Sequence, residues 1–337
     1  MKKLYWVLAL AVIVFFNSCG LLDGDGTGGF DAILNAAPYK GLTDSIENDP
    51  KNAALLLKRA DLLTQNNRSD IAYYDYKKSY ELQPSEATAL LYSSSLFMTG
   101  RNKEVITLLQ DCINKYPQNT EFSRRLGEVY VQTGNTTEAL AIYDNLLKTD
   151  SSNFDVYHEK GLLYAAVKDT AKAIAMLQQS YNIQPTIRTG LALANFYAET
   201  NNANTLALCD ALSLRDTARD FIEPLFLKGV YYSNIKEYAK AISLFDECTT
   251  RNWQFIEPYI EKGIIFYEQK NYDEALKTFQ MAASIQYTYP DCYYWLGRCY
   301  EAIGKVEEAK DHYFKALTFD RDFTEAREAL DRIRAKK

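Results

Sequence analysis

The chain has 337 residues, of which 24% are charged and 47% hydrophobic, and a formal net charge of −6. This composition is typical of a globular protein. An acidic chain without a basic stripe is a poor partner for a phosphate backbone, so we expect no nucleic-acid partner.

The first 18 residues have the pattern of a secretory signal peptide. Residues 1–3 (MKK) are positively charged, and residues 4–16 form an apolar run of 13. A membrane-spanning helix needs about 20 apolar residues, so this run is too short to be one. We therefore expect residues 1–18 to be a cleaved leader.

The junction that follows, Phe16-Asn17-Ser18-Cys19, resembles the lipobox of bacterial lipoproteins. The resemblance implies cleavage before Cys19 and lipidation of this residue. Ser18 has the expected small side chain, whereas Phe16 replaces the usual leucine. The alternative is an ordinary signal peptide with an incidental cysteine. Each buried methylene contributes about 0.8 kcal/mol, so two or three acyl chains would hold the protein on a membrane. Because no aspartate follows Cys19, the analogy favours the outer membrane.

Two short segments separate this junction from the body of the chain. Residues 19–30 are rich in glycine and aspartate, which predicts a flexible tether. Its aspartates lack the spacing and the closing glutamate of a calcium loop, so we expect no metal site. Residues 31–52 end like the second helix of a repeat, and they predict an N-terminal capping helix.

Residues 53–323 repeat with a period of 34, apart from one deletion. A small residue recurs in the first half of each unit, at Gly127, Gly161, Asn195, Gly229, Gly263 and Gly297. A second small residue recurs in the other half, at Ala139, Ala173, Ala207, Ala241, Ala275 and Ala309. Apolar residues follow helical i, i+3, i+4 spacing, so each unit is predicted to be a helical hairpin. Such a hairpin cannot bury its apolar face alone and must stack on its neighbours.

This pattern of small residues, aromatics and a late proline resembles the tetratricopeptide repeat. The resemblance implies an all-α superhelical solenoid of about eight helical hairpins with terminal capping helices and a concave groove. Unit 188–221 matches least, because Asn195, Ala198 and Ala211 replace the expected small and aromatic residues. We expect loose packing or an irregularity there. Residues 324–337 predict a C-terminal capping helix.

Nothing in the sequence predicts an enzyme, a catalytic residue or a cofactor. His158 and His312 lie in different units, and the chain has no CxxC, HExxH, GxSxG or Walker motif. We interpret His158 as a solvated surface residue, with a ligand contact as the alternative. The five cysteines after Cys19 are predicted to be buried free thiols.

The family resemblance implies which positions line the concave groove. The partner-binding residues that it predicts are Phe226, Val230, Ile260, Ile264, Tyr267, Tyr294 and Arg298. We expect them to form an exposed apolar stripe flanked by charge, the kind of surface that marks an interaction site. The alternative is that neighbouring units cover part of the stripe. The equivalent residues of an earlier unit, which include Arg124 and Glu128, are more polar and less convincing.

Two function classes agree with these observations. The first is a lipid-anchored scaffold of the bacterial outer membrane, on its periplasmic face or at the cell surface. It would bind a peptide or helix of an envelope partner in its groove, in secretion, envelope assembly or the regulation of murein enzymes. The second is a carbohydrate-capture outer-membrane lipoprotein resembling the starch-binding family. Against the second, the repeats run almost without interruption and leave no long insertion for a glycan pocket.

Overall fold

The structure is a computed structural model that describes residues 30–215 and 221–335. Within these ranges the regular secondary structure consists of nineteen helices and no strand. None of these helices is both long and apolar enough to cross a membrane. The predicted signal peptide, Cys19 and the tether up to residue 29 lie outside the described residues.

Helices α3 to α18 alternate as the first and second helices of eight repeat units, which confirms the predicted all-α helical-hairpin solenoid. The first helices are α3 (Ala53–Gln65), α5 (Glu86–Met98), α7 (Thr120–Gln132), α9 (Phe154–Ala166), α11 (Ile187–Glu199), α13 (Glu223–Asn234), α15 (Glu257–Glu268) and α17 (Pro290–Ala302). The second helices are α4 (Ser69–Leu82), α6 (Asn102–Lys115), α8 (Thr136–Thr149), α10 (Thr170–Ile183), α12 (Asn204–Ser213), α14 (Tyr238–Arg251), α16 (Tyr272–Ile285) and α18 (Val306–Phe319). Two short helices, α1 (Asp31–Leu34) and α2 (Lys40–Asn48), precede the repeats, and α19 (Thr324–Ala335) follows them.

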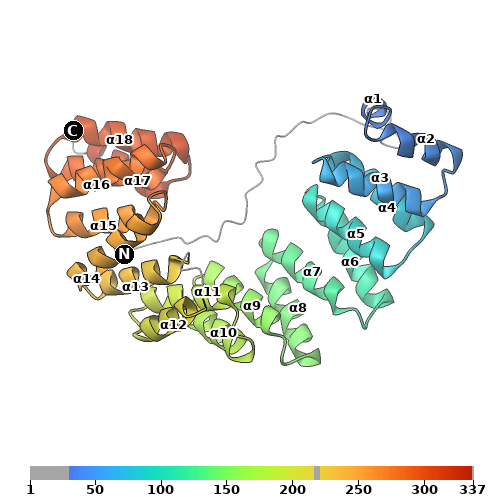
Figure 1. The fold of residues 1–337 in the computed structure, drawn as a ribbon, viewed down its shortest axis with the longest axis horizontal. Coiled ribbons are helices and arrows are strands. Elements are labelled where there is room, and N and C mark those ends of the chain that lie inside the picture. The colour runs from blue at the N-terminus through green and yellow to red at the C-terminus, as the bar shows by residue number, and fades with distance from the viewer. Residues whose placement is uncertain (1–29, 216–220, 336–337) are drawn as a thin grey trace. The chain divides into compact units, whose positions relative to one another are not determined.

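The chain divides into two compact units, residues 1–142 and 143–337, with the division inside α8. In each unit the hairpins follow one another in chain order (Figure 1). One hydrophobic core runs from Leu34 to Val129 in the first unit, and another runs from Ile256 to Ile333 in the second. Within these two stretches, successive hairpins therefore share a core with their neighbours.

The turn inside each hairpin contains one residue with a positive φ angle. These residues are Asn67, Gly100, Gly134, Lys168, Asn201, Lys236, Lys270 and Gly304. A left-handed residue ends a helix by directing the next N–H groups back to the last carbonyls. Asn271 illustrates the pattern, because its N–H donates to the carbonyl of Phe266 at 2.9 Å. The turn therefore reverses the chain within three or four residues.

The two helices of a hairpin approach closely where a glycine faces a large side chain. A Cβ atom placed on Gly263 would lie 2.5 Å from the ring of Phe279, and one placed on Gly297 would lie 2.6 Å from Tyr313. Phe279 and Tyr313 are fully buried. Glycine is required at these positions because any side chain would overlap the ring.

Unit 188–221 is where the predicted register is wrong. The buried small residue of its first helix is Ala194, not Asn195, and the buried residue of its second helix is Thr205, because Ala207 is exposed. Only residues 184–186 separate α10 from α11, whereas residues 286–289 separate α16 from α17. This deletion moves α11 by one residue relative to the 34-residue ladder. The second helix, α12, has 10 residues and is shorter than the 14 residues of α10.

A buried ion pair ties the N-terminal helices to the first hairpin. Arg59 of α3 donates two hydrogen bonds to Asp75 of α4, at 2.7 and 2.8 Å, and a third to the hydroxyl of Thr43 at 3.1 Å. Thr43 lies on α2 and donates to the carbonyl of Leu34 at 2.8 Å. The hydrogen bonds of Thr43 and Asp75 satisfy most of the polar atoms that burial removes from water.

Candidate partner-binding surface

Four of the predicted groove residues are not exposed. Phe226, Val230, Ile260 and Ile264 have between 0% and 6% of their surface accessible. The predicted exposed apolar stripe is therefore wrong at these positions. The reason is that these side chains face the core: Phe226 contacts the rings of Phe245 and Phe255, and Ile260 and Ile264 belong to the core that contains Phe279.

The other three predicted residues are only partly buried, and they lie together. Arg298 of α17 donates one hydrogen bond to the hydroxyl of Tyr294 at 3.0 Å and another to that of Tyr267, on α15, at 3.1 Å. Its guanidinium carbon lies 5.2 Å from the ring centre of Tyr267 and 5.4 Å from that of Trp295. We call Tyr267, Tyr294, Trp295 and Arg298 the arginine cage.

Further ring contacts hold the cage in place. Trp295 stacks on the buried Phe279 with ring centres 5.9 Å apart, and Tyr294 meets Phe323 edge to face at 5.3 Å. Aromatic pairs of this kind add about 0.5–1.5 kcal/mol each to the burial of their area. The arginine is thus held by rings that belong to the core on one side and reach the surface on the other.

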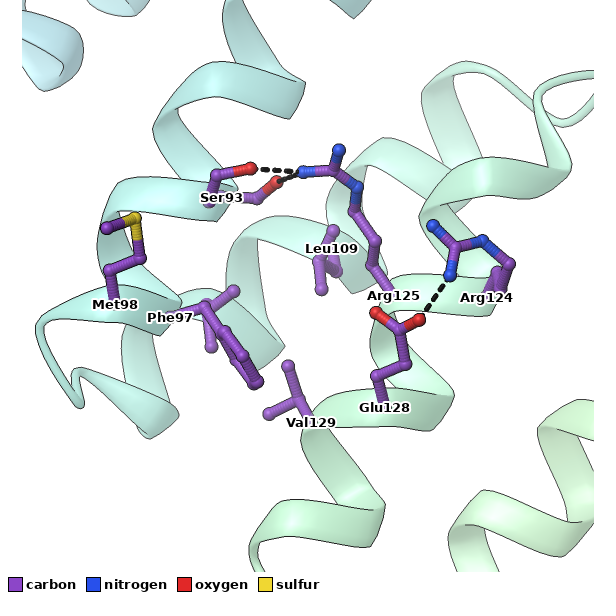
Figure 2. A pocket seen from close by; sticks show the side chains of 10 residues that line it. Ser93, Phe97, Met98, Leu109, Arg124, Arg125, Glu128 and Val129 are labelled. Carbon is purple, nitrogen blue, oxygen red and sulfur yellow. Dashed lines mark hydrogen bonds and ion pairs between the residues drawn. The ribbon is translucent and has the colours of Figure 1, made fainter. Parts of the chain in front are cut away.

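The first unit has a pocket on the corresponding surface of its own first helices. The pocket has a volume of 310 Å³ and is lined by Ser93, Ser94, Phe97, Met98, Val105, Leu109, Arg124, Arg125, Glu128 and Val129. Helices α5 and α7 supply its walls, and Val105 and Leu109 of α6 supply its floor. Figure 2 shows Phe97, Leu109 and Val129 on its apolar side and the two arginines on its polar side.

The polar side of this pocket is a network of ion pairs. Arg125 donates to Glu121 at 2.8 Å, to the carbonyl of Leu90 at 2.8 Å and to Ser94 at 2.5 Å. Arg124 donates to Glu121 at 2.7 and 2.8 Å and also pairs with Glu128. The hydrogen bonds from Arg124 and Arg125 lower the pKa of Glu121. Arg124 and Arg125 are already paired with Glu121 and Glu128, so their charges are balanced. The pocket therefore offers a ligand mainly its apolar side.

His158 is buried, so its interpretation as a solvated surface residue is wrong. It has no accessible surface, and its Nδ1 lies 3.0 Å from the hydroxyl oxygen of Thr189. Burial, with a smaller contribution from Arg188, lowers its pKa to about 4. His312 lies between aromatic rings, stacked on Tyr300 at 5.1 Å. Thr189 is itself buried, so the contact between His158 and Thr189 lies in the interior of the repeats.

The part of the chain that the structure describes contains no cluster of three or more metal-ligating side chains. Its five cysteines are buried and free, as predicted. Burial raises the pKa of Cys209, Cys248 and Cys299 to about 12, so these thiols are protonated and unreactive at neutral pH.

Sequence reasoning missed two features of this surface. Trp295 was not among the predicted residues, although it lies directly between Tyr294 and the next helical turn, where Arg298 stands. The pocket of the first unit was also missed. Its signal is the pair Ser93-Ser94, whose small side chains line the pocket between α5 and α7.

Models of one repeat family match several parts of the chain. The models described as tetratricopeptide repeat match residues 290–323, residues 96–162, and residues 154–187 together with 222–252. The matched segments are helical hairpins whose turns and seams are described above. The chain contains tetratricopeptide repeats.

Known proteins with this repeat resemble the chain at low identity. Tetratricopeptide repeat protein 21B of Mus musculus is 25% identical over 183 residues, which cover 51% of this chain and 13% of the mouse protein. The same protein of Xenopus laevis is 25% identical over 146 residues, covering 43% of this chain and 11% of the relative. The chain therefore spans about an eighth or less of the length of these curated relatives.

Solved structures share the fold. A tetratricopeptide repeat protein from Parabacteroides merdae is 12% identical, with a TM-score of 0.52 over 83% of this chain and 98% of that one. The type IV pilus biogenesis factor PilW is 17% identical, with a TM-score of 0.51 over 63% of this chain and 99% of that one. A chain of the APC/C hetero-tetramer Cut9-Hcn1 is 17% identical, with a TM-score of 0.51 over 86% of this chain and 57% of that one. At these identities the likeness concerns the fold alone.

Proposed function

We propose that this chain is a non-enzymatic scaffold that holds a peptide or helix of a protein partner against its first helices. Tetratricopeptide-repeat proteins generally serve as protein-interaction scaffolds. The observation that carries the proposal is the arginine cage, where Arg298 and three aromatic side chains lie partly exposed on α15 and α17. Arginine, tyrosine and tryptophan are the residues that most often dominate the energy of protein interfaces.

We further propose that the scaffold is a lipoprotein of the bacterial outer membrane, anchored through Cys19. The support is the leader pattern of residues 1–18 and the small residue before Cys19. An anchored scaffold would meet its partner within the cell envelope. The carbohydrate-capture alternative is not favoured, because the chain contains tetratricopeptide repeats, and proteins with this repeat generally serve as protein-interaction scaffolds.

Site-specific photocrosslinking in living cells tests the partner-binding surface. A photoreactive phenylalanine analogue replaces Tyr294 in the cage or, as the matched control, Phe314, which is 48% exposed on the second helix α18. We expect a discrete crosslinked protein from position 294 and none from position 314. Equal crosslinking from both positions, or none from position 294, would refute binding on the first helices.

The same experiment includes an anchor arm, in which the chain carries Cys19→Ser. We expect the unchanged chain to incorporate an alkyne-labelled fatty acid and to sediment with outer membranes. The Cys19→Ser chain should do neither, because it lacks the acylated residue. Fatty-acid incorporation that survives the Cys19→Ser change would contradict this anchor and leave the partner-binding arm unaffected.

A further inference from the structure

Arg298 differs from every other shielded arginine that the structure describes. Six arginines within residues 30–215 and 221–335 are at least partly shielded from solvent, and five of them have a carboxylate oxygen within 3.1 Å. These five are Arg59, Arg68, Arg101, Arg124 and Arg125. The sixth is Arg298, whose hydrogen-bond partners are the hydroxyls of Tyr294 and Tyr267.

The nearest acidic residue along the same helix is already engaged. Glu301 accepts a hydrogen bond from the hydroxyl of Tyr313 at 2.9 Å and forms an ion pair with Arg332 at 2.7 Å. A guanidinium has five N–H donors and keeps its charge at any physiological pH. The cage therefore shields a full positive charge partly from water and surrounds it with rings and hydroxyls, but with no carboxylate.

From this missing counter-ion we propose that the partner places an aspartate or glutamate side chain on Arg298. A carboxylate would form charge-assisted hydrogen bonds with the remaining N–H groups, and these are about twice as strong as neutral ones. The partly exposed rings of Tyr267, Tyr294 and Trp295 would cover the apolar part of that side chain and its neighbour. The occupant is thus an acidic segment of a protein partner, a refinement that rests on the proposed function.

A peptide-display selection tests this assignment. The bait is the full mature chain, and the probe is a library of randomised twelve-residue peptides whose C-termini are fused to the phage coat, so that only side-chain carboxylates are available. We expect the selected peptides to contain aspartate or glutamate. A synthetic copy of the tightest peptide, amidated at its C-terminus, then gives a Kd for each variant of the chain.

The variants separate the charge of Arg298 from its shape. Arg298→Gln should raise the Kd at least tenfold, and Arg298→Lys, which keeps the charge but loses the planar group, should raise it less. Arg251→Gln changes the net charge equally at an exposed residue that pairs with Glu247, and it should leave the Kd within twofold. Circular dichroism checks the fold. If Arg298→Gln loses helicity, the test rests on the Kd of Arg298→Lys and on the Kd of the peptide with its own Glu→Gln change.

The effects of changing Arg298 and of changing the peptide's glutamate on the Kd should also depend on each other. Changing the critical glutamate of the peptide to glutamine should raise the Kd for the unchanged chain at least tenfold. The same change should not raise the Kd for the Arg298→Gln chain any further. The proposal is overturned if the selection enriches no acidic peptide, or if the glutamine peptide binds equally well. A crosslinked partner at position 294 that persists in the Arg298→Gln chain would leave the scaffold function standing while the carboxylate assignment fails.

Discussion

The burial of one polar side chain can set the pH dependence of this repeat array. His158 of α9 is fully buried, its Nδ1 contacts Thr189 of α11, and its Nε2 has no hydrogen-bond partner. Protonation would place a positive charge on a buried side chain that also lies near the positive charge of Arg188. The neutral form is therefore the form that the folded state accepts.

We predict that His158 makes the protein less stable on acidification. Its pKa is about 4 in the folded chain and ordinarily 6.5, so its contribution to stability is complete above pH 6.5 and is lost as the pH falls to 4. A difference of this size corresponds to about 3 kcal/mol. His158→Gln cannot titrate, and urea titrations between pH 7 and pH 4 should show the unchanged chain losing about that much more free energy of unfolding than the variant.

The comparison with His158→Gln is necessary because another group acts in the opposite direction. Burial raises the pKa of Asp291 from 3.8 to about 6, so Asp291 adds stability as the pH falls through 6. Asp291 is present in both proteins and cancels in the difference. Parallel stability curves for the two proteins would contradict the assignment to His158.

At the scale of the helix, unit 188–221 exchanges the positions of its large and small residues. In the preceding hairpin, Tyr157 of α9 lies four residues before the seam glycine Gly161, and the small residue Ser180 lies on α10. In α11 and α12 the tyrosine is replaced by Gly190 and the small residue by Leu212. A Cβ atom on Gly190 would lie 2.7 Å from Leu212. At this seam the large side chain therefore comes from the second helix, whereas in α9 and α10 it comes from the first.

We predict that the two exchanged residues are energetically coupled. Gly190→Tyr should destabilise the protein by about 1–3 kcal/mol through overpacking, and Leu212→Ala by about 2–5 kcal/mol through a cavity. The double variant removes the overlap with Leu212 but keeps that with Tyr181, which lies 2.9 Å from a Cβ atom at position 190, so urea titrations should show a loss smaller than the sum by at least about 1 kcal/mol. Ile187→Ala, exposed on the same helix, should combine with Leu212→Ala additively. Additive losses for the Gly190 pair would show that the seam does not exchange volume.

At the scale of the molecule, stability should be local. A hairpin of a repeat array contacts only its neighbours, so the free energy of unfolding is close to a sum over adjacent pairs. The second unit follows this rule, because α15 packs on α13, α14, α16 and α17, and the structure shows no extensive contact of α15 with α9 or α10. A defect in one seam therefore weakens its neighbours first.

We predict that Gly263→Leu destabilises the α15–α16 hairpin and leaves distant hairpins unchanged. The added side chain overlaps the ring of Phe279, with an expected cost of about 1–3 kcal/mol. Hydrogen exchange measured by mass spectrometry should become faster in α13 to α17 and stay the same in α9 and α10. The control is Gly41→Leu, because a Cβ atom on Gly41 meets nothing within 4 Å. Equal acceleration throughout the unit would show that it unfolds as one body.

Much of the fold could be predicted because repetition encodes it. The spacing from Gly229 to Gly263 to Gly297 identifies the hairpins, since a contact that recurs every 34 residues must be made by the same surface each time. The register failed only where a deletion moved α11, and an exchanged pair of side chains hid the seam. A pattern of single positions cannot detect such an exchange, because the large and the small residue of the seam lie on different helices.

The candidate site could be predicted only in part. The sequence by itself determined the hairpins, their seams and the aromatic character of positions 267, 294 and 295. Which groove residues are covered was decided by the tertiary structure, because exposure depends on how closely one first helix packs on the next, and Ile260 and Ile264 became core while Tyr267 did not. The same packing left Arg298 among rings without a carboxylate, since the position of a counter-ion is a property of neighbouring helices and not of spacing along the chain.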